Sequence, residues 1–162
     1  MAFFQAEVSR QALLFSKVLE YVKSQNWKYQ VIGDDKNVIE LQMRLKSKLN
    51  SCRVLIVAEE KVIQAYAVAP LHAQPDTYAN VVEFITRANY GLKMGGFEFD
   101  YRDGEVRYQS CLTCREGIPS LKDIEFAVDV TFIMMDRYGN GLAKNIMGFG
   151  DPAKDIAEAE NS

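Results

Sequence analysis

The chain opens with a helical pattern of apolar residues and then changes to a strand pattern. Apolar positions recur every three or four residues from Val8 to Gln25, which predicts an amphipathic helix. Apolar and polar residues alternate in 27–31 and 39–45, and this period predicts two strands with one covered face each. Residues 52–58 and 62–69 are apolar on both sides, so we expect central strands there.

A second helix follows a linker bounded by Pro70 and Pro75. We expect this helix from Asp76, a suitable N-cap, to Asn89, with a cap glycine at Gly91. The segment after it, beginning at Gly95-Gly96, leads into a hairpin.

The hairpin is predicted from Asp103-Gly104, a pair typical of two-residue β-turns. Counting outward from this turn pairs Phe99 with Tyr108 and Asp100 with Arg107. One face of the hairpin then carries aromatic and β-branched side chains, and the other carries complementary charges.

The last helix is predicted to start at Ser120, because Asp123 three residues later completes a capping-box pattern. Its apolar positions keep a helical period to Ile146, across Gly139-Asn140-Gly141. Each helical glycine costs up to about 1 kcal/mol relative to alanine. The sequence therefore leaves open whether the helix is continuous or broken at these glycines.

Charge divides the chain into two parts. Residues 151–162 hold four acidic residues and one basic residue, and we expect them to form an acidic, mobile tail. Of the 19 basic and 22 acidic residues, 18 of each remain in 1–150, which we expect to be a single domain. A neutral domain gives no strong field for nucleic acid. The cluster Arg44, Lys46, Lys48 and Arg53 is more typical of a solvated hairpin tip than of a phosphate site.

The apolar segments of the chain predict the cellular location of the protein. No apolar run reaches the roughly 18 residues that cross a bilayer, and residues 1–5 do not have the pattern of a secretory signal. We therefore expect a cytoplasmic protein without a membrane partner.

Three segments resemble the signature of the YbjN family: 84–91 (FITRANYG), 96–100 (GFEFD) and 103–108 (DGEVRY). Residues 134–138 (MMDRY) add to this resemblance, which is similar to cyanobacterial members. The predicted element order, α-β-β-β-β-α-β-β-α, describes an α+β fold with an antiparallel sheet flanked by helices. The resemblance implies a fold like that of type III secretion chaperones, which commonly dimerise. Family members are labelled bacterial sensory transduction regulators, and the resemblance carries over no catalytic residues.

The candidate reactive groups lack partners in the sequence. A zinc site at Cys111 and Cys114 would need about four ligands, and Cys52 and the only histidine, His72, do not form a second ligand pair. A general base at His72 would need an orienting group and a nucleophile, and neither stands in a recognisable setting. We therefore predict no catalytic, cofactor-binding or metal-ligating residue and no cofactor.

Bulky residues outside the main apolar stripe of the last helix give the remaining candidate site. Phe126, Phe132, Met134 and Met135 are either buried on a second side of the helix or form a surface for self-association or a client. Our leading hypothesis is a non-enzymatic protein-binding module, chaperone- or adaptor-like, with a regulatory role and a homodimeric state. The alternative is a small-ligand sensor with a closed pocket between sheet and helices.

Overall fold

One antiparallel sheet runs through the whole molecule. The computed structural model describes residues 8–162. The sheet has the strand order β1-β2-β3-β4-β6-β5, so the β4–β6 pair is the point where its neighbours are not consecutive in the chain. The strands are β1 (Tyr29–Ile32), β2 (Val38–Arg44), β3 (Ser51–Ala58), β4 (Val62–Val68), β5 (Gly96–Phe99) and β6 (Val106–Thr113).

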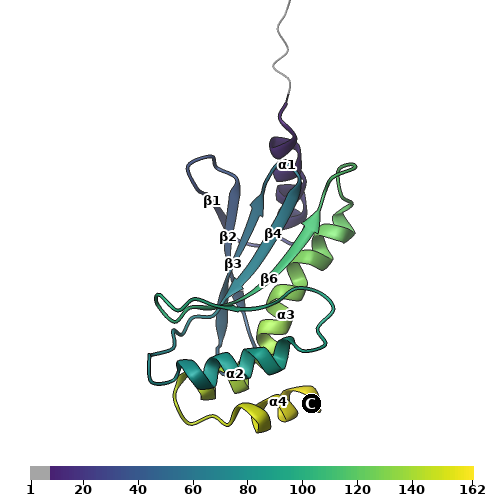
Figure 1. The fold of residues 1–162 in the computed structure, drawn as a ribbon. Helices are drawn as coiled ribbons and strands as arrows, with labels where there is room; N and C mark the ends of the chain where they lie inside the picture. The colour runs from purple at the N-terminus through teal and green to yellow at the C-terminus, as the bar shows by residue number, and fades with distance from the viewer. Residues whose placement is uncertain (1–7) are drawn as a thin grey trace, which may run out of the picture.

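Helices cover one face and one end of this sheet (Figure 1). Helices α1 and α3 pack against β3, with α3 also crossing β4 and β6, whereas α2 packs beside β5 and α4 lies against α2 and α3. The helices are α1 (Arg10–Ser24), α2 (Tyr78–Asn89), α3 (Leu121–Ile146) and α4 (Pro152–Glu160). The predicted α+β class and the predicted order up to α3 are confirmed.

The core lies between the sheet and the pair α1 and α3. Alternate residues of the central strands, such as Val54, Ile56 and Ile63, are fully buried, as are Val18 of α1 and Val128 of α3. Full burial of such a side chain contributes about 1.5–3 kcal/mol. This alternation leaves every second strand residue pointing away from the helices, and those residues form the other face of the sheet.

Two local predictions are wrong in detail. Helix α2 has its N-cap at Thr77, because Asp76 belongs to the preceding turn, where Thr77 Oγ1 accepts from the N–H of Gln74. The hairpin pairs Phe99 with Val106 and Phe97 with Tyr108, so the predicted register is shifted.

The shift arises because Asp103-Gly104 is part of a longer turn. The N–H of Asp100 donates to the carbonyl of Glu105 (2.9 Å), and the N–H of Gly104 donates to Asp100 (2.8 Å). Four residues therefore lie between the closing pair, with Gly104 at φ +75°. The predicted opposition of charges persists with another partner, since Arg107 Nε lies 2.6 Å from Glu98.

Helix α3 is continuous through Gly139 and Gly141. A Cβ at Gly139 would lie 2.8 Å from Ser47 Cβ, and one at Gly141 would lie 2.6 Å from the Phe84 ring. The glycines therefore let the β2–β3 loop and α2 approach the helix closely. Asn140 between them accepts from the N–H of Lys48 (2.8 Å), which anchors the loop.

The predicted mobile tail is wrong for residues 152–160, which form α4. Asp151 caps this helix and Pro152 occupies its first turn, an arrangement that favours helix initiation. Asp155 is buried and accepts hydrogen bonds from Asn145 Nδ2 and the Asp151 N–H (2.9 Å each) and from Lys144 Nζ (3.1 Å). These contacts explain how a polar segment packs against the domain.

Candidate functional site

The predicted interaction residues of α3 do not form one surface. Met135 is fully buried in the core, so its assignment to an exposed surface is wrong. Phe132 and Met134 are half-buried and pack against the core, and Phe132 lies edge-on to Trp27 at 6.0 Å. Phe126 is 57% exposed and shares the outer side of the helix with Ile133, seven residues later. Helix α3 is thus buried on more than one side.

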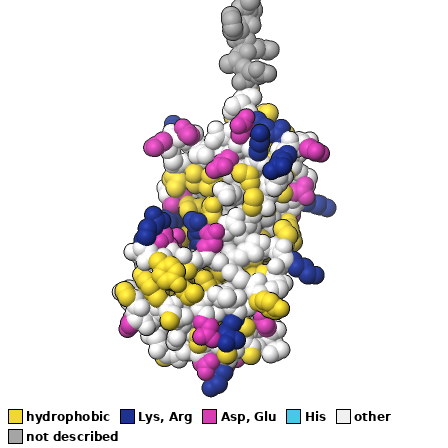
Figure 2. All heavy atoms as spheres, in the orientation of Figure 1, with side chains coloured by type: hydrophobic (Ala, Val, Ile, Leu, Met, Phe, Trp, Pro, Cys, Tyr) yellow, Lys and Arg dark blue, Asp and Glu magenta, His cyan; other side chains and the backbone are white. Residues whose placement is uncertain are grey.

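The sheet face opposite α1 and α3 carries a second set of apolar side chains, and we call it the open face. Its centre consists of Val38, Leu55, Val57, Val62 and Tyr66, all half-buried. Leu55 pairs with Tyr66 across β3 and β4, and Val38 pairs with Val57 across β2 and β3. Hydrophobic side chains gather over the strands in the space-filling view, with basic and acidic groups beside them (Figure 2).

Ion pairs surround the apolar centre of the open face. Arg107 lies 4.3 Å above the Tyr66 ring and also contacts Glu98, while Arg53 lies 3.8 Å from Glu40. Burial raises the pKa of Tyr66, and the nearby Arg107 opposes this shift. An apolar centre with a polar rim is the usual composition of a protein-binding surface.

The two edges of the sheet differ. On the β5 edge, Asn89 Nδ2 donates to the carbonyl of Phe97 (2.9 Å), and Asn89 Oδ1 accepts from the N–H of Phe97 (2.7 Å). One amide side chain thus takes the N–H and the carbonyl of Phe97, which a further strand would otherwise use.

The β1 edge has no such cover. Within residues 8–162, β1 pairs with β2 and no strand pairs with its outer side. A groove beside it is lined by Trp27, Tyr29 and Leu41, together with polar residues of β1 and β2. Val31 on this edge is 40% exposed, so apolar surface and a free strand edge occur together.

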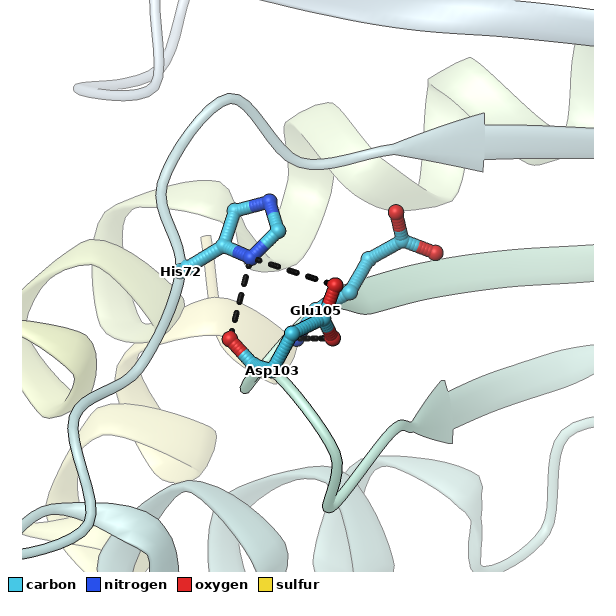
Figure 3. Close-up of side chains that lie close together, drawn as sticks. All are labelled: His72, Asp103 and Glu105. Carbon is cyan, nitrogen blue, oxygen red and sulfur yellow. Dashed lines mark hydrogen bonds and ion pairs between the residues drawn. The ribbon is translucent and has the colours of Figure 1, made fainter.

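A cluster of titratable side chains joins the linker before α2 to the hairpin tip. His72 Nδ1 lies 3.1 Å from the backbone oxygen of Asp103 and 3.8 Å from its Oδ2. One ligand atom from each of His72, Asp103 and Glu105 lies within 4.8 Å of the others. Figure 3 shows the His72 ring turned toward Asp103, with Glu105 beside it.

The backbone holds these residues in place. The N–H of Ala73 donates to the carbonyl of Gly104 (2.9 Å), and the N–H of Glu105 donates to Asp103 Oδ1 (3.0 Å). A Cβ at Gly104 would lie 3.0 Å from the carbonyl carbon of Ala73, so a glycine is needed for the linker to approach. The sequence did not reveal this cluster, because His72 and Asp103 are 31 residues apart.

The three free cysteines occupy different environments. Burial raises the pKa of Cys52 to about 12, with a smaller effect from the charge of Asp136. Burial also raises the pKa of Cys114, whereas Cys111 is exposed on the open face. The two thiols of the Cys-x-x-Cys pair therefore differ in accessibility.

The predicted basic cluster is divided between two places. Lys46 and Lys48 are exposed in the β2–β3 loop, whose Ser47 N–H donates to Asp136 on α3 (2.8 Å). Arg53 instead belongs to the open face, where Glu40 and Glu105 (4.0 Å) balance its charge.

Comparison with known proteins gives a family match and a similar solved structure. A model of the YbjN family, described as "Putative bacterial sensory transduction regulator", matches residues 16–144. The structure is similar to "Crystal structure of YbjN, a putative transcription regulator from E. coli", with a TM-score of 0.60 and 10% identity over 82% of this chain and 91% of that chain. No curated protein matches significantly.

The family match confirms the family resemblance seen in residues 84–108, whereas the similarity to cyanobacterial members has no support. The type III secretion chaperone-like character stays a prediction. Within residues 8–162, each helix is too short or too polar to cross a membrane.

Proposed function

The chain belongs to the YbjN family, and from this membership we propose that it is a non-enzymatic regulatory protein that binds other proteins in a chaperone- or adaptor-like way. The family description is that of a regulator rather than an enzyme. The proposal includes a cytoplasmic location and a homodimeric state. The observation that supports it most directly is the combination of an uncovered sheet face with a single blocked edge.

The open face is the surface that we assign to a protein partner. Its half-buried apolar centre fits a segment rich in apolar side chains, and its rim of paired arginines and glutamates fits polar residues on either side of that segment. Because the rim charges already balance one another, the face has little attraction for a polyanion.

Affinity purification from the native cell, followed by reconstitution with each purified partner, tests the open face. Leu55→Glu places a charge at its centre and should abolish partner binding. Tyr66→Ala should weaken binding, and Tyr90→Ala is its matched control because Tyr90 is 91% exposed on a loop elsewhere. A reconstituted partner that binds Leu55→Glu as well as it binds the wild type would refute this assignment.

The β1 edge is the surface that we assign to a second copy of the chain. Two β1 strands can pair antiparallel about a two-fold axis, which makes one continuous sheet. An axis through Val31 brings Lys28 of each copy beside Asp34 of the other, so the charges at both ends are complementary. The exposed Val31 side chains meet at the centre of this contact.

Multi-angle light scattering tests the dimer, with an expected mass of twice the 18.4 kDa of one chain. Val31→Lys introduces a charge that discourages edge pairing, and it should give the monomer. Val8→Lys is the control, since Val8 is also exposed but lies before α1. A monomeric wild type, or a dimeric Val31→Lys variant, would contradict the β1 contact.

The sensor alternative gains no support from the hollow beside the hairpin. That hollow is open to solvent and is lined mainly by Glu98, Asp100, Arg102, Glu105 and Arg107. These charges already pair with one another, for example Arg102 with Asp100 at 2.6 Å. A small ligand would have to displace existing ion pairs to bind there.

A further inference from the structure

We propose that His72, Asp103 and Glu105 form a binding site for a divalent transition-metal ion, with Zn²⁺ as the reference ion. The site bridges the linker before α2 and the tip of the β5–β6 hairpin (Figure 3). The site does not depend on the proposed protein-binding function, but it borders the open face, because Glu105 also lies 4.0 Å from Arg53 there.

The ligand set determines the class of metal. One imidazole nitrogen and two carboxylates suit Zn²⁺ and its first-row neighbours better than Ca²⁺ or Mg²⁺, which favour all-oxygen sites. Metal–ligand bonds of about 2.0–2.2 Å require donor atoms about 3–4 Å apart. The donor atoms of these three residues lie within 4.8 Å of one another. His72 and Asp103 are exposed, so their side chains can close the remaining gap.

The backbone reduces the cost of assembling the site. The linker and the hairpin are already joined, since Ala69 donates to Val106 and Ala73 donates to Gly104 (2.9 Å each). The hydrogen bond from the Glu105 N–H to Asp103 Oδ1 also restrains the Asp103 side chain and leaves Oδ2 facing His72. An ion therefore orders few additional degrees of freedom when it binds.

The two carboxylates of the cluster attract a cation, and the Arg53 side chain competes with that cation for Glu105. Two carboxylates face one imidazole, and Arg53 lies 4.0 Å from Glu105 Oε2. A bound ion would take the place of the hydrogen bond between His72 Nδ1 and the Asp103 carbonyl. That carbonyl oxygen would remain close enough to serve as a further metal ligand. Arg53 competes with the ion for Glu105, so removal of the Arg53 charge should strengthen metal binding.

Calorimetric titration of the full chain with Zn²⁺ tests the site. We would use a Cys111→Ser background, because an exposed thiol binds zinc by itself. The expected result is one ion per chain, at least about tenfold weaker binding in His72→Ala and Asp103→Asn, and tighter binding in Arg53→Gln. Glu60→Gln serves as the control, since it removes an exposed acidic charge outside the cluster.

A second readout uses the fact that His72 is the only histidine. Its imidazole signals in the NMR spectrum should shift or broaden when the metal is added, and chelation should restore them. Circular dichroism on each variant shows whether the fold is retained. Three results would each overturn the proposal. These are zinc binding that His72→Ala leaves unchanged, no zinc binding in the Cys111→Ser background, and imidazole signals that do not change when the metal is added.

Discussion

Gly141→Ala sets two physical effects against each other in the middle of α3. In an isolated helix, alanine is favoured over glycine by about 1 kcal/mol. In this structure, the added Cβ would lie 2.6 Å from the Phe84 ring and 3.0 Å from the Asp155 Cβ. Both neighbours are buried, so the packing must shift at a cost of about 1–3 kcal/mol. The propensity gain offsets part of this cost, and we expect a net destabilisation of about 1 kcal/mol.

Urea unfolding measures the effect. Trp27, the single tryptophan, lies edge-on to Tyr21 at 5.6 Å, so its fluorescence reports the loss of packing. The urea concentration at the midpoint of unfolding should be lower in Gly141→Ala than in the wild type. The m-value, the slope of the unfolding free energy against urea concentration, should stay unchanged.

Phe84→Leu shows whether the ring causes the loss. If it does, the Gly141→Ala, Phe84→Leu double variant should be more stable than the sum of the single changes predicts, by about 1 kcal/mol. Gly139→Ala is the matched control, because the obstacle there is Ser47 and not Phe84. Its cost should add to that of Phe84→Leu. A Gly141→Ala variant as stable as the wild type would refute the close-approach explanation.

Further predictions concern the C-terminal helix, the blocked edge and the buried thiol. Asp155→Ala should lower the free energy of unfolding by about 3 kcal/mol in urea titrations, because it leaves buried donors unpaired. Asn89→Ala should expose the Phe97 backbone and increase self-association in light scattering; unchanged mass at high concentration would contradict this. The free energy of unfolding should fall as pH rises from about 9 to 12, because burial raises the pKa of Cys52 from 9.0 to about 12 and the unfolded thiol ionises first. Cys52→Ala should flatten this slope, and native protein should show one reactive thiol, Cys111.

The sequence predicts those parts of the fold that depend on local periodicity. The strand alternation at Ile39 and Leu41 and the capping box at Ser120 need no distant partner, and the structure contains both. The predicted hairpin register is wrong because the turn closes at Asp100 and Glu105. The Asp103-Gly104 pair alone does not specify the length of the turn.

The features that the sequence does not predict depend on contacts between segments that are far apart in the chain. Helix α4 buries only Ile156 and Ala159 as apolar side chains, and its packing also uses the hydrogen bond from Asn145 to Asp155, which periodicity does not reveal. The sequence does not show how many sides of α3 are buried, and for this reason the assignment of Met135 to an exposed surface is wrong. His72 gains its acidic neighbours through the approach of the linker to Gly104.

The unequal edges of the sheet also limit how far the protein can assemble. A filament built by sheet extension needs two receptive edges on every subunit, so that each added copy offers a new site. Here Asn89 occupies the Phe97 backbone on one side, which leaves β1 as the receptive edge. In the proposed dimer, pairing through β1 would consume that edge in both copies, and growth would stop at two. In such an assembly the Asn89 side chain would prevent further sheet extension at β5, and so would oppose polymerisation of the exposed sheet.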